Sequence, residues 1–296
     1  MNQYVITGSL GNISRPVVEG LVARGKAVSV ITSKADKVAD IEKLGAEALV
    51  GDVNDASFIR DAFRGAEVVY TMIPPIWQTD DWRKAQNVVA DNYVAALAEN
   101  RVSRVVNLSS VGAHLGHGCG PVDGLYDFEQ KLNAVPGLHV KHLRPSFFYH
   151  NFLGQIPMVK GAGILGANYG GSHTLFLVHP RDIAQAALEE LLNPDFTGSS
   201  VRYIAGDERD GKTIAAVLGK AIGKELPWVE FSDEQQLDGA LGAGLPAAIA
   251  RDYTQMGHAL RDGSMQEDIR KHRPALSPTK LEDFAREFAQ AYLAGG

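Results

Sequence analysis

Residues 3–15 read Gln3-Tyr4-Val5-Ile6-Thr7-Gly8-Ser9-Leu10-Gly11-Asn12-Ile13-Ser14-Arg15, a short apolar run followed by two glycines three positions apart. A glycine directly after a strand lets the chain turn with a positive φ. A second glycine lets backbone N–H groups approach a pyrophosphate at the N-terminus of the next helix. Ser14 takes the place of a third glycine and is small enough to keep helix and strand close. This spacing predicts a dinucleotide-binding turn if a strand–helix–strand unit contains it; otherwise it is an ordinary turn.

The first half of the chain repeats such units. Short apolar runs without period-two polarity indicate strands covered on both faces, at Gln3–Thr7, Ala27–Ile31, Glu47–Val50, Glu67–Thr71, Arg104–Ser109 and His139–Leu143. Helical patterns lie between them, at Val17–Arg24, Ser57–Phe63 and Trp82–Glu99. Alternation at a spacing of about 25 residues favours parallel strands with right-handed crossovers. The sequence predicts an α/β fold with a doubly wound parallel sheet, the Rossmann architecture.

The alternation of strands and helices becomes less regular after about Pro145, and a smaller, mainly helical C-terminal lobe is expected there. Gly161–Gly171 holds five glycines in eleven residues and predicts a mobile loop. A helix is predicted at Pro180–Leu192, a strand at Ser200–Ala205 and a last helix at Pro278–Leu293. We therefore expect a nucleotide-binding domain at 1–150 and a substrate or lid lobe at 151–296, with 174–205 returning to the sheet.

Composition excludes several classes of protein. The 296 residues include 29 basic and 35 acidic side chains, a net charge of −6, and the basic residues are scattered, which disfavours direct nucleic-acid binding. The single cysteine, Cys119, excludes a disulfide framework and a Cys-rich zinc module. The sequence contains no run of 18 apolar residues, so no membrane span is predicted. The N-terminal residues lack a signal-peptide pattern. A reducing cytoplasm is the expected location.

The end of the second predicted strand indicates which dinucleotide binds. An NAD site usually carries a carboxylate there, about 20 residues after the turn, to hold the ribose hydroxyls. This chain has Val30-Ile31-Thr32-Ser33-Lys34, and Lys37 follows. Ser33, Lys34 and Arg15 suit a 2′-phosphate, so NADP is predicted in preference to NAD, although the lysines could instead solvate the start of a helix.

Two further strand ends fit the rim of the same site. Asp52 follows the third predicted strand and could hydrogen-bond the adenine amino group, or cap a helix at Asn54–Phe63. Thr71, Met72 and Ile73 close the fourth strand and would pass under the cofactor.

The chain resembles the NmrA-like group of the atypical short-chain dehydrogenase/reductases over roughly residues 1–225. The matching pieces are Thr7–Ile13, Gly51-Asp52-Val53, Val106–Gly112, Phe128-Glu129-Gln130-Lys131-Leu132, Leu143–Phe152 and Asp182-Ile183-Ala184. The resemblance implies an NADP-binding fold in which residues 145–147 lie beside the nicotinamide. Together with the residue patterns it predicts a cofactor site made of Thr7, Gly8, Leu10, Gly11, Asn12, Ile13, Arg15, Ser33, Lys34, Asp52, Thr71, Met72, Ile73, Ser109, Pro145 and Phe147.

The catalytic residues are harder to assign. Short-chain dehydrogenases place a lysine one helical turn after the catalytic tyrosine, so that its ammonium favours the phenolate. Tyr126 is the natural candidate, but Gln130 stands four residues later and cannot supply that charge. Lys131 is five residues later and points about 140° away. Tyr126 could therefore be catalytic or simply pack at the start of a helix, and His150 is the other candidate proton donor.

Two other motifs suggest different functions. Gly206-Asp207-Glu208-Arg209-Asp210-Gly211-Lys212-Thr213 matches the Walker A pattern, yet its three carboxylates would repel the phosphates of a nucleoside triphosphate. His114, His117 and Cys119 offer metal ligands on a loop too rich in glycine to hold a preformed site. Neither a P-loop nor a metal site is expected.

Members of the resembled group are either small-molecule reductases or redox-sensing regulators. We expect an NADPH-dependent reductase of a quinone-like or other conjugated small molecule, because Phe147–Phe152 is rich in aromatic residues and suits a flat apolar substrate. The alternative is a non-catalytic NADP-binding sensor that acts through a protein partner. Whether the chain forms a homodimer is left open.

Overall fold

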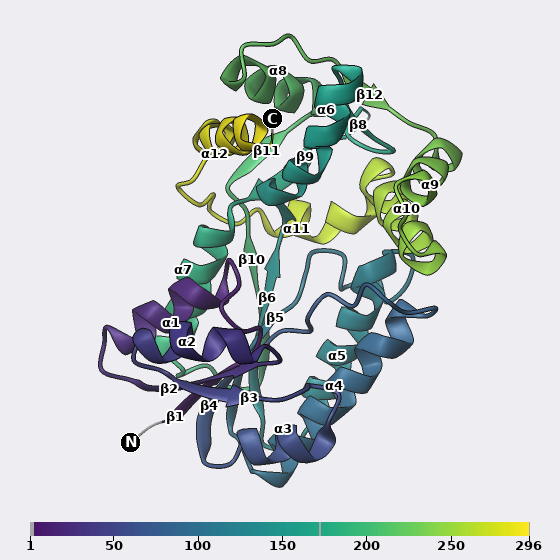
Figure 1. Ribbon diagram of the computed structural model, residues 1–296. Coiled ribbons are helices and arrows are strands. Elements are labelled where there is room, and N and C mark those ends of the chain that lie inside the picture. Colours follow the sequence, from purple (N-terminus) through teal and green to yellow (C-terminus); the bar gives the residue numbers. More distant parts are fainter. Residues whose placement is uncertain (1–2, 172, 296) are drawn as a thin grey trace.

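The computed structural model describes residues 3–171 and 173–295. Its centre is a sheet of seven parallel strands in the order β10-β6-β5-β4-β1-β2-β3 (Figure 1). This confirms the predicted doubly wound parallel sheet, and each of the six strands predicted in the first half is present. The strands are β1 (Gln3–Ile6), β2 (Ala27–Thr32), β3 (Glu47–Val50), β4 (Ala66–Thr71), β5 (Arg104–Leu108), β6 (His139–Pro145) and β10 (Ser199–Ile204).

Both faces of the sheet are covered by helices, which explains why the strands lack polar alternation. Ile6 packs in a core shared with Leu21, while its neighbour Val5 packs on the opposite face with Val89. One face carries α1 (Ser14–Val22), α2 (Val38–Lys43) and α7 (Pro180–Leu192), and the other carries α3 (Ala56–Ala62), α4 (Trp82–Glu99) and α5 (Asp123–Asn133) (Figure 1).

The strand order reverses at β1, which lies between β2 and β4. The chain moves outward to β3 on one side of β1 and to β5, β6 and β10 on the other. In open parallel sheets, ligands bind at the carboxyl ends of the strands where the order reverses. The fold therefore predicts a ligand site at the carboxyl ends of β1 and β4.

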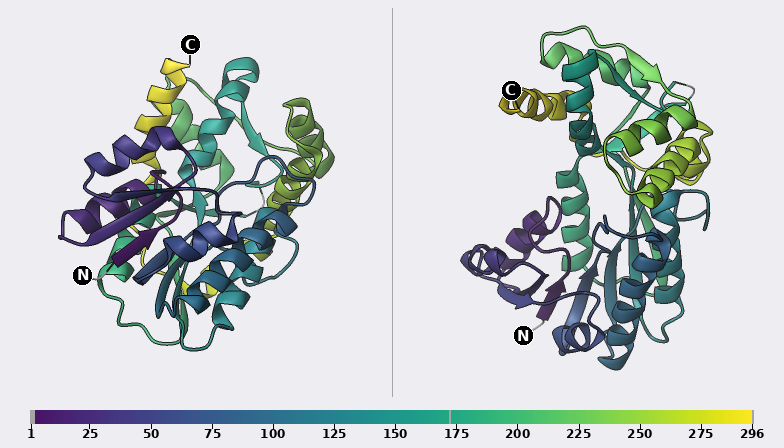
Figure 2. Two further views of the ribbon diagram at one scale, coloured as in Figure 1. Left: turned by 60° about the horizontal axis from the view of Figure 1, so that its bottom comes forward. Right: turned by 45° about the vertical axis from the view of Figure 1, so that its right-hand side comes forward.

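A second layer of structure covers this end of the sheet. The chain leaves the sheet after β6, returns through α7 to β10 and leaves again, so the lobe contains two separate segments (Figures 1 and 2). Two small sheets, β11-β9-β7 and β12-β8, form its framework. Its elements are β7 (Phe147–Phe148), α6 (Ile156–Ala162), β8 (Leu165–Ala167), β9 (Leu175–Val178), β11 (Asp207–Arg209), α8 (Gly211–Ala221), β12 (Trp228–Glu230), α9 (Asp233–Gly242), α10 (Ala247–Arg261), α11 (Glu267–His272) and α12 (Leu281–Ala294).

Among the described residues, no helix combines the length and the apolar character needed to cross a membrane.

The prediction of a mobile loop at Gly161–Gly171 is wrong. Residues 165–167 form the buried strand β8, which pairs with β12. A Cβ atom on Gly166 would lie 2.4 Å from the carbonyl oxygen of Val229, and one on Gly170 would lie 2.8 Å from the ring of Trp228. These glycines allow two segments to pack closely, a role that composition alone does not distinguish from flexibility.

Candidate functional site

The turn after β1 has the backbone geometry of an anion-binding loop. Gly8 has a φ of +87°, and a Cβ atom on it would lie 2.9 Å from the sulfur of Met72, so neither conformation nor space admits a side chain. Ser9 also has a positive φ, +55°, and its hydroxyl donates to Oγ1 of Thr32 at 2.9 Å. The turn thus contacts the end of β2 before it enters α1.

The N-terminus of α1 offers hydrogen-bond donors to a ligand. Within residues 3–171 and 173–295, the backbone N–H groups of Asn12 and Ile13 have no acceptor, and Ile13 cannot cap the helix with its side chain. The hydroxyl of Ser14 donates to the carbonyl oxygen of Thr7 at 3.2 Å and so holds the helix against the strand. Free N–H groups at the positive end of a helix bind phosphate. The turn therefore fits the pyrophosphate of a dinucleotide.

The end of β2 gathers cations around one carboxylate. Nη2 of Arg15 lies 4.0 Å from Asp40, and Nζ of Lys37 lies 3.8 Å from the same carboxylate. Ser33 and Lys34 are exposed beside this group. Asp40, which the sequence pattern does not single out, faces these cations from α2 and partly neutralises their charge.

The threonines at the strand ends have a structural role. Thr7 accepts a hydrogen bond from the backbone N–H of Met72 at 2.8 Å, and Thr71 donates to Asn107 at 3.0 Å. Both threonines are fully buried, and their hydroxyls connect the ends of neighbouring strands. Their side chains are therefore not available to a bound dinucleotide. Leu10 and Ile13, named for the same turn, pack partly buried against the core under α1.

Asp52 is exposed after β3 and accepts hydrogen bonds from the backbone and side chain of Asn54. The interpretation of Asp52 as a helix cap is wrong, because α3 begins one turn later and Asp55 accepts from the N–H groups of Ser57 and Phe58. Contact of Asp52 with adenine stays a prediction.

Two chambers lie where the strand ends meet the lobe. The inner chamber, about 420 Å³, is bordered by residues that follow β4, β5 and β6, among them Met72, Ile73, Ser109 and Ser146. The outer chamber, about 570 Å³, is bordered by lobe residues such as Gln155, Tyr169 and Phe231. The two chambers share five wall residues and so form one groove: Trp77, Phe147, Asn151, Tyr253 and Met256.

Several aromatic rings line this groove. The ring of Tyr253 is stacked on Trp77 at a centroid distance of 6.2 Å and meets Trp82 edge-on at 5.4 Å. Phe147, predicted for the cofactor site, lines both chambers, whereas Pro145 is buried at the end of β6 and lines neither. Such walls suit a flat apolar molecule held against a few polar groups.

Tyr126 is placed away from the groove. Leu125, its neighbour on α5, lines the inner chamber, and successive helical residues point about 100° apart. The ring of Tyr126 instead lies against Gly116, where an added Cβ atom would be 3.1 Å from it. Lys131 pairs with Asp91 of α4. The structure therefore brings neither member of the usual Tyr–Lys pair to the chamber walls.

A buried charged group lies directly behind Ser109. The hydroxyl of Ser109, which lines the inner chamber, donates to Oε1 of Glu129 at 2.5 Å. Arg144 donates to both oxygens of Glu129, at 3.0 and 2.6 Å, and reaches Asp268 of α11 at 3.2 Å. Glu129 is only 1% exposed. Sequence reasoning missed this network, although a glutamate on the core face of a predicted helix needs a buried partner.

His150 links the phosphate turn to the last helix. Its Nδ1 lies 3.4 Å from the side-chain nitrogen Nδ2 of Asn12, and its Nε2 lies 3.3 Å from Glu287 of α12. His179 reaches the same carboxylate at 3.1 Å, and Arg181 donates to it at 2.7 Å. Burial raises the pKa of Glu287, but hydrogen bonds from His179 and His150 outweigh it and hold that pKa below its ordinary value.

His150, His179 and Glu287 are residue types that bind metals, and their facing atoms lie within 4.8 Å of one another. Hydrogen bonding argues against a metal here. The backbone N–H and the Nε–H of Arg181 both donate to Nδ1 of His179, so the proton of a neutral His179 lies on Nε2, the nitrogen that faces Glu287. A protonated nitrogen cannot ligate, and Arg181 already supplies a positive charge to the carboxylate.

The segment that matches the Walker A pattern does not form a phosphate cradle. It contains β11 and the start of α8, where the Asp210 carboxylate accepts from the N–H of Thr213. The buried Asp207 accepts from the hydroxyl of Tyr149 and the N–H of Leu281. Carboxylates thus occupy the helix N-terminus that a P-loop keeps for phosphate.

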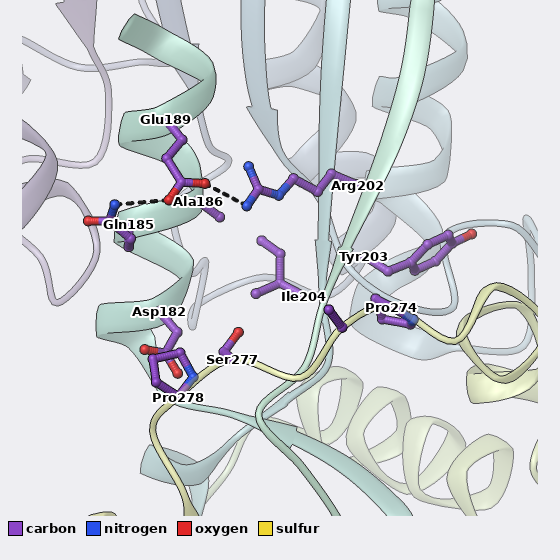
Figure 3. A pocket seen from close by; sticks show the side chains of 11 residues that line it. Asp182, Gln185, Ala186, Glu189, Arg202, Tyr203, Ile204, Pro274, Ser277 and Pro278 are labelled. Atoms are coloured by element: carbon purple, nitrogen blue, oxygen red, sulfur yellow. Dashed lines mark hydrogen bonds and ion pairs between the residues drawn. The ribbon is translucent and has the colours of Figure 1, made fainter. Parts of the chain in front are cut away.

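A further cavity of about 460 Å³ lies between α7, β10 and residues 274–278 (Figure 3). Its charged groups are already paired, because Arg202 bonds to Glu189 and Glu190 and Asp182 accepts from Thr279. None of its lining residues borders the groove. We therefore place the candidate site in the two chambers and the adjoining phosphate turn.

Residues 8–127 match the family model of NAD(P)H-binding domains. The match contains the turn after β1, the cation group after β2 and the ends of β3, β4 and β5. It agrees with the geometry of the turn, and this part of the chain is an NAD(P)H-binding domain.

The relatives that match nearly the whole chain include two reductases. A (4-alkanoyl-5-oxo-2,5-dihydrofuran-3-yl)methyl phosphate reductase of Streptomyces griseus is 23% identical over 293 residues, covering 97% of this chain and 98% of the relative. An NAD(P)H azoreductase of Xenophilus azovorans is 21% identical over 290 residues, covering 98% of each.

Solved structures show the same fold. The triphenylmethane reductase of Citrobacter sp. superposes with a TM-score of 0.81 at 18% identity, covering 97% of this chain and 99% of that one. An NADPH-dependent quinone oxidoreductase of Escherichia coli superposes with a TM-score of 0.79 at 20% identity, covering 96% and 98%.

Proposed function

We propose that this chain, which belongs to the NmrA-like group of the atypical short-chain dehydrogenase/reductases, is an NADPH-dependent reductase of flat, conjugated small molecules such as quinones. The observation that carries the proposal is the aromatic groove at the carboxyl ends of β4, β5 and β6. It lies beside the switch point of the sheet, where the turn after β1 receives the dinucleotide.

The relatives support reduction as the reaction. Two of the relatives that match nearly the whole chain are reductases by name, and the superposed dye and quinone enzymes act on conjugated molecules by their names. The redox-sensor alternative is not favoured, because a sensor needs no substrate groove of this size beside its cofactor.

Each part of the chain has a task in this reaction. The turn and the N-terminus of α1 would hold the pyrophosphate, and Met72 and Ile73 would line the cofactor site. Bound NADPH supplies the hydride. Trp77, Phe147 and Tyr253 hold the flat substrate and displace water from its faces, which keeps the reacting groups oriented.

The preference for NADPH over NADH is part of the proposal. Lys34 and Arg15 would meet the 2′-phosphate, with Ser33 as a hydroxyl donor. One or two charge-assisted hydrogen bonds at about 1.5–3 kcal/mol each would give at least about tenfold tighter binding. Titration calorimetry with both nucleotides tests this, with Lys34→Ala expected to weaken NADPH binding and leave NADH binding unchanged. Equal affinities in the wild-type protein would contradict the assignment of the cations.

The decisive experiment for the proposed function follows NADPH oxidation against a panel of quinones, azo dyes and enones. Trp77→Ala, which removes a wall shared by both chambers, should raise KM for the accepted substrates. Trp228→Phe is the matched control, because Trp228 borders neither chamber. Tight NADPH binding with no turnover on any substrate would favour the sensor instead.

A further inference from the structure

The groove offers few groups that can release a proton. Among the described residues that line the two chambers, the titratable side chains are His150, Tyr169 and Tyr253. Of these, Tyr253 alone borders the inner chamber, the one at the ends of β4, β5 and β6. A reductase of quinones or enones must deliver a proton as well as a hydride. That proton must come from a residue that lines the groove or from water.

The other two candidates are less well placed. Both ring nitrogens of His150 are engaged, one by Asn12 and the other by Glu287. Tyr169 is 8% exposed, and its ring is packed against Phe147 at 5.5 Å and Trp228 at 6.2 Å. Both residues border only the outer chamber.

The backbone around Tyr253 is fixed to two different parts of the molecule. The carbonyl oxygen of Asp252 would be 2.0 Å from a Cβ atom on Gly120, so the two segments are in close contact. Gln255 accepts from the N–H of Gly120 at 3.2 Å, and the carbonyl oxygen of Thr254 accepts from Asn168 at 2.9 Å. α10 therefore holds Tyr253 over the groove without relying on its side chain.

The side chain of Tyr253 is held by rings and has a free hydroxyl. Trp77 and Trp82 contact its ring, and no described residue hydrogen-bonds its hydroxyl. The residue is half-buried. Burial raises the pKa of Tyr253, so the phenol is protonated at neutral pH.

We propose that Tyr253 is a catalytic residue that donates the proton in this reduction, taking from the C-terminal lobe the task that Tyr126 cannot perform on α5. The inference rests on the proposed function. A quinone or enone gains a hydride from NADPH at carbon, and the electron pair moved onto oxygen takes the proton of Tyr253. The phenolate that remains is reprotonated by water, so the reaction consumes one NADPH and one proton.

The test compares two acceptors that differ in their need for a proton. A quinone needs hydride and proton, whereas a triarylmethyl cation dye becomes its neutral leuco form by gaining hydride alone. Tyr253→Phe should lower kcat for the quinone by about 100-fold, the lower end for general acid catalysis, with KM changed by less than about threefold. The same variant should reduce the dye at the wild-type rate. Tyr126→Phe, the matched control, should leave both rates unchanged.

Each outcome decides the proposal. An equal loss on both acceptors would show that Tyr253 only shapes the groove, and an unchanged quinone rate would assign the proton to water. Reduction of the dye alone by the wild-type protein would also overturn it. If only the quinone is reduced, a solvent deuterium isotope effect on kcat that Tyr253→Phe abolishes supports the proposal, and one that persists contradicts it. If the wild-type protein reduces none of the acceptors, the proposed function itself is wrong. This outcome is distinguishable from a failure of the proposal for Tyr253, which needs an active wild-type protein.

Discussion

The hydroxyl of Ser109 donates its proton to Glu129, whose two oxygens are also held by Arg144. Because that proton is engaged, Ser109 presents only oxygen lone pairs to the inner chamber and accepts hydrogen bonds from what binds there. It therefore cannot polarise a substrate carbonyl by donation. The buried ion pair sets the direction of the hydrogen bond that the chamber offers.

Glu129→Gln should destabilise the protein by about 3–5 kcal/mol, because it leaves Arg144 as a buried charge without its carboxylate. Ser109→Ala removes one hydrogen bond and should cost about 1 kcal/mol. Chemical denaturation measures both. The double variant Glu129→Gln, Arg144→Met should recover part of the loss, and no recovery would mean that Glu129 matters for another reason.

The two glycines of the turn should respond differently to alanine. Gly8→Ala forces a side chain into a left-handed conformation against Met72, so NADPH affinity should fall more than about tenfold. The space at Gly11 is open, since its nearest atom to an added Cβ lies 3.5 Å away, and Gly11→Ala should cost much less. Calorimetric titration of both variants measures this difference, and equal losses would contradict it.

Asp40→Asn should strengthen NADPH binding. The carboxylate lies near Arg15 and Lys37 and would repel a 2′-phosphate bound among them. Its removal should raise the affinity for NADPH several-fold at low salt and leave that for NADH unchanged. The comparison is repeated at high salt, where the gain should shrink. A gain for both nucleotides would place Asp40 near the pyrophosphate instead.

His142 should make stability depend on pH. It lies between Asn107 and Asn133, and burial lowers the pKa of His142 to about 4. The unfolded chain takes up this proton near pH 6.5, so the stabilisation is complete above that pH. It is lost as the pH falls toward 4, by up to about 3 kcal/mol. Denaturation of wild type and His142→Gln across this window should give converging stabilities at low pH, and parallel curves would contradict the assignment.

The Walker A match should have no nucleotide chemistry. Millimolar Mg-ATP should neither raise the melting temperature nor be hydrolysed, because Asp210 already caps α8. Lys212→Ala should leave NADPH affinity unchanged. A thermal shift with ATP that this variant abolished would show that the segment does bind phosphate.

The parts of the molecule that depend on local pattern could be predicted from the sequence. The parallel strands and α4 follow from short apolar runs and a helical period, and Gly8 follows from its place after a strand. The site beyond the turn could not be predicted so well. Tyr253 lies on α10, more than 100 residues from the strand ends it faces, and no spacing rule connects them.

The wrong prediction for Gly161–Gly171 and the position of Tyr126 away from the groove have the same physical origin. Five glycines in eleven residues indicate either a flexible loop or close packing, and only the partner segment, β12, distinguishes them. The direction in which Tyr126 points depends on the orientation of α5 against the sheet, which its place in the sequence does not specify. Glu129, three residues later, points to the core and takes the charged contact with Ser109.

The hydrogen bonds from Asn12 through His150 to Glu287 have a consequence for how the protein is made. A ribosome releases the phosphate turn early, and the first βαβ units can fold while synthesis continues. His150 acquires its carboxylate partner only when residue 287 has emerged. The contact that joins the phosphate turn to α12 therefore forms late in translation, and a nascent chain halted before α12 would carry a folded sheet without it.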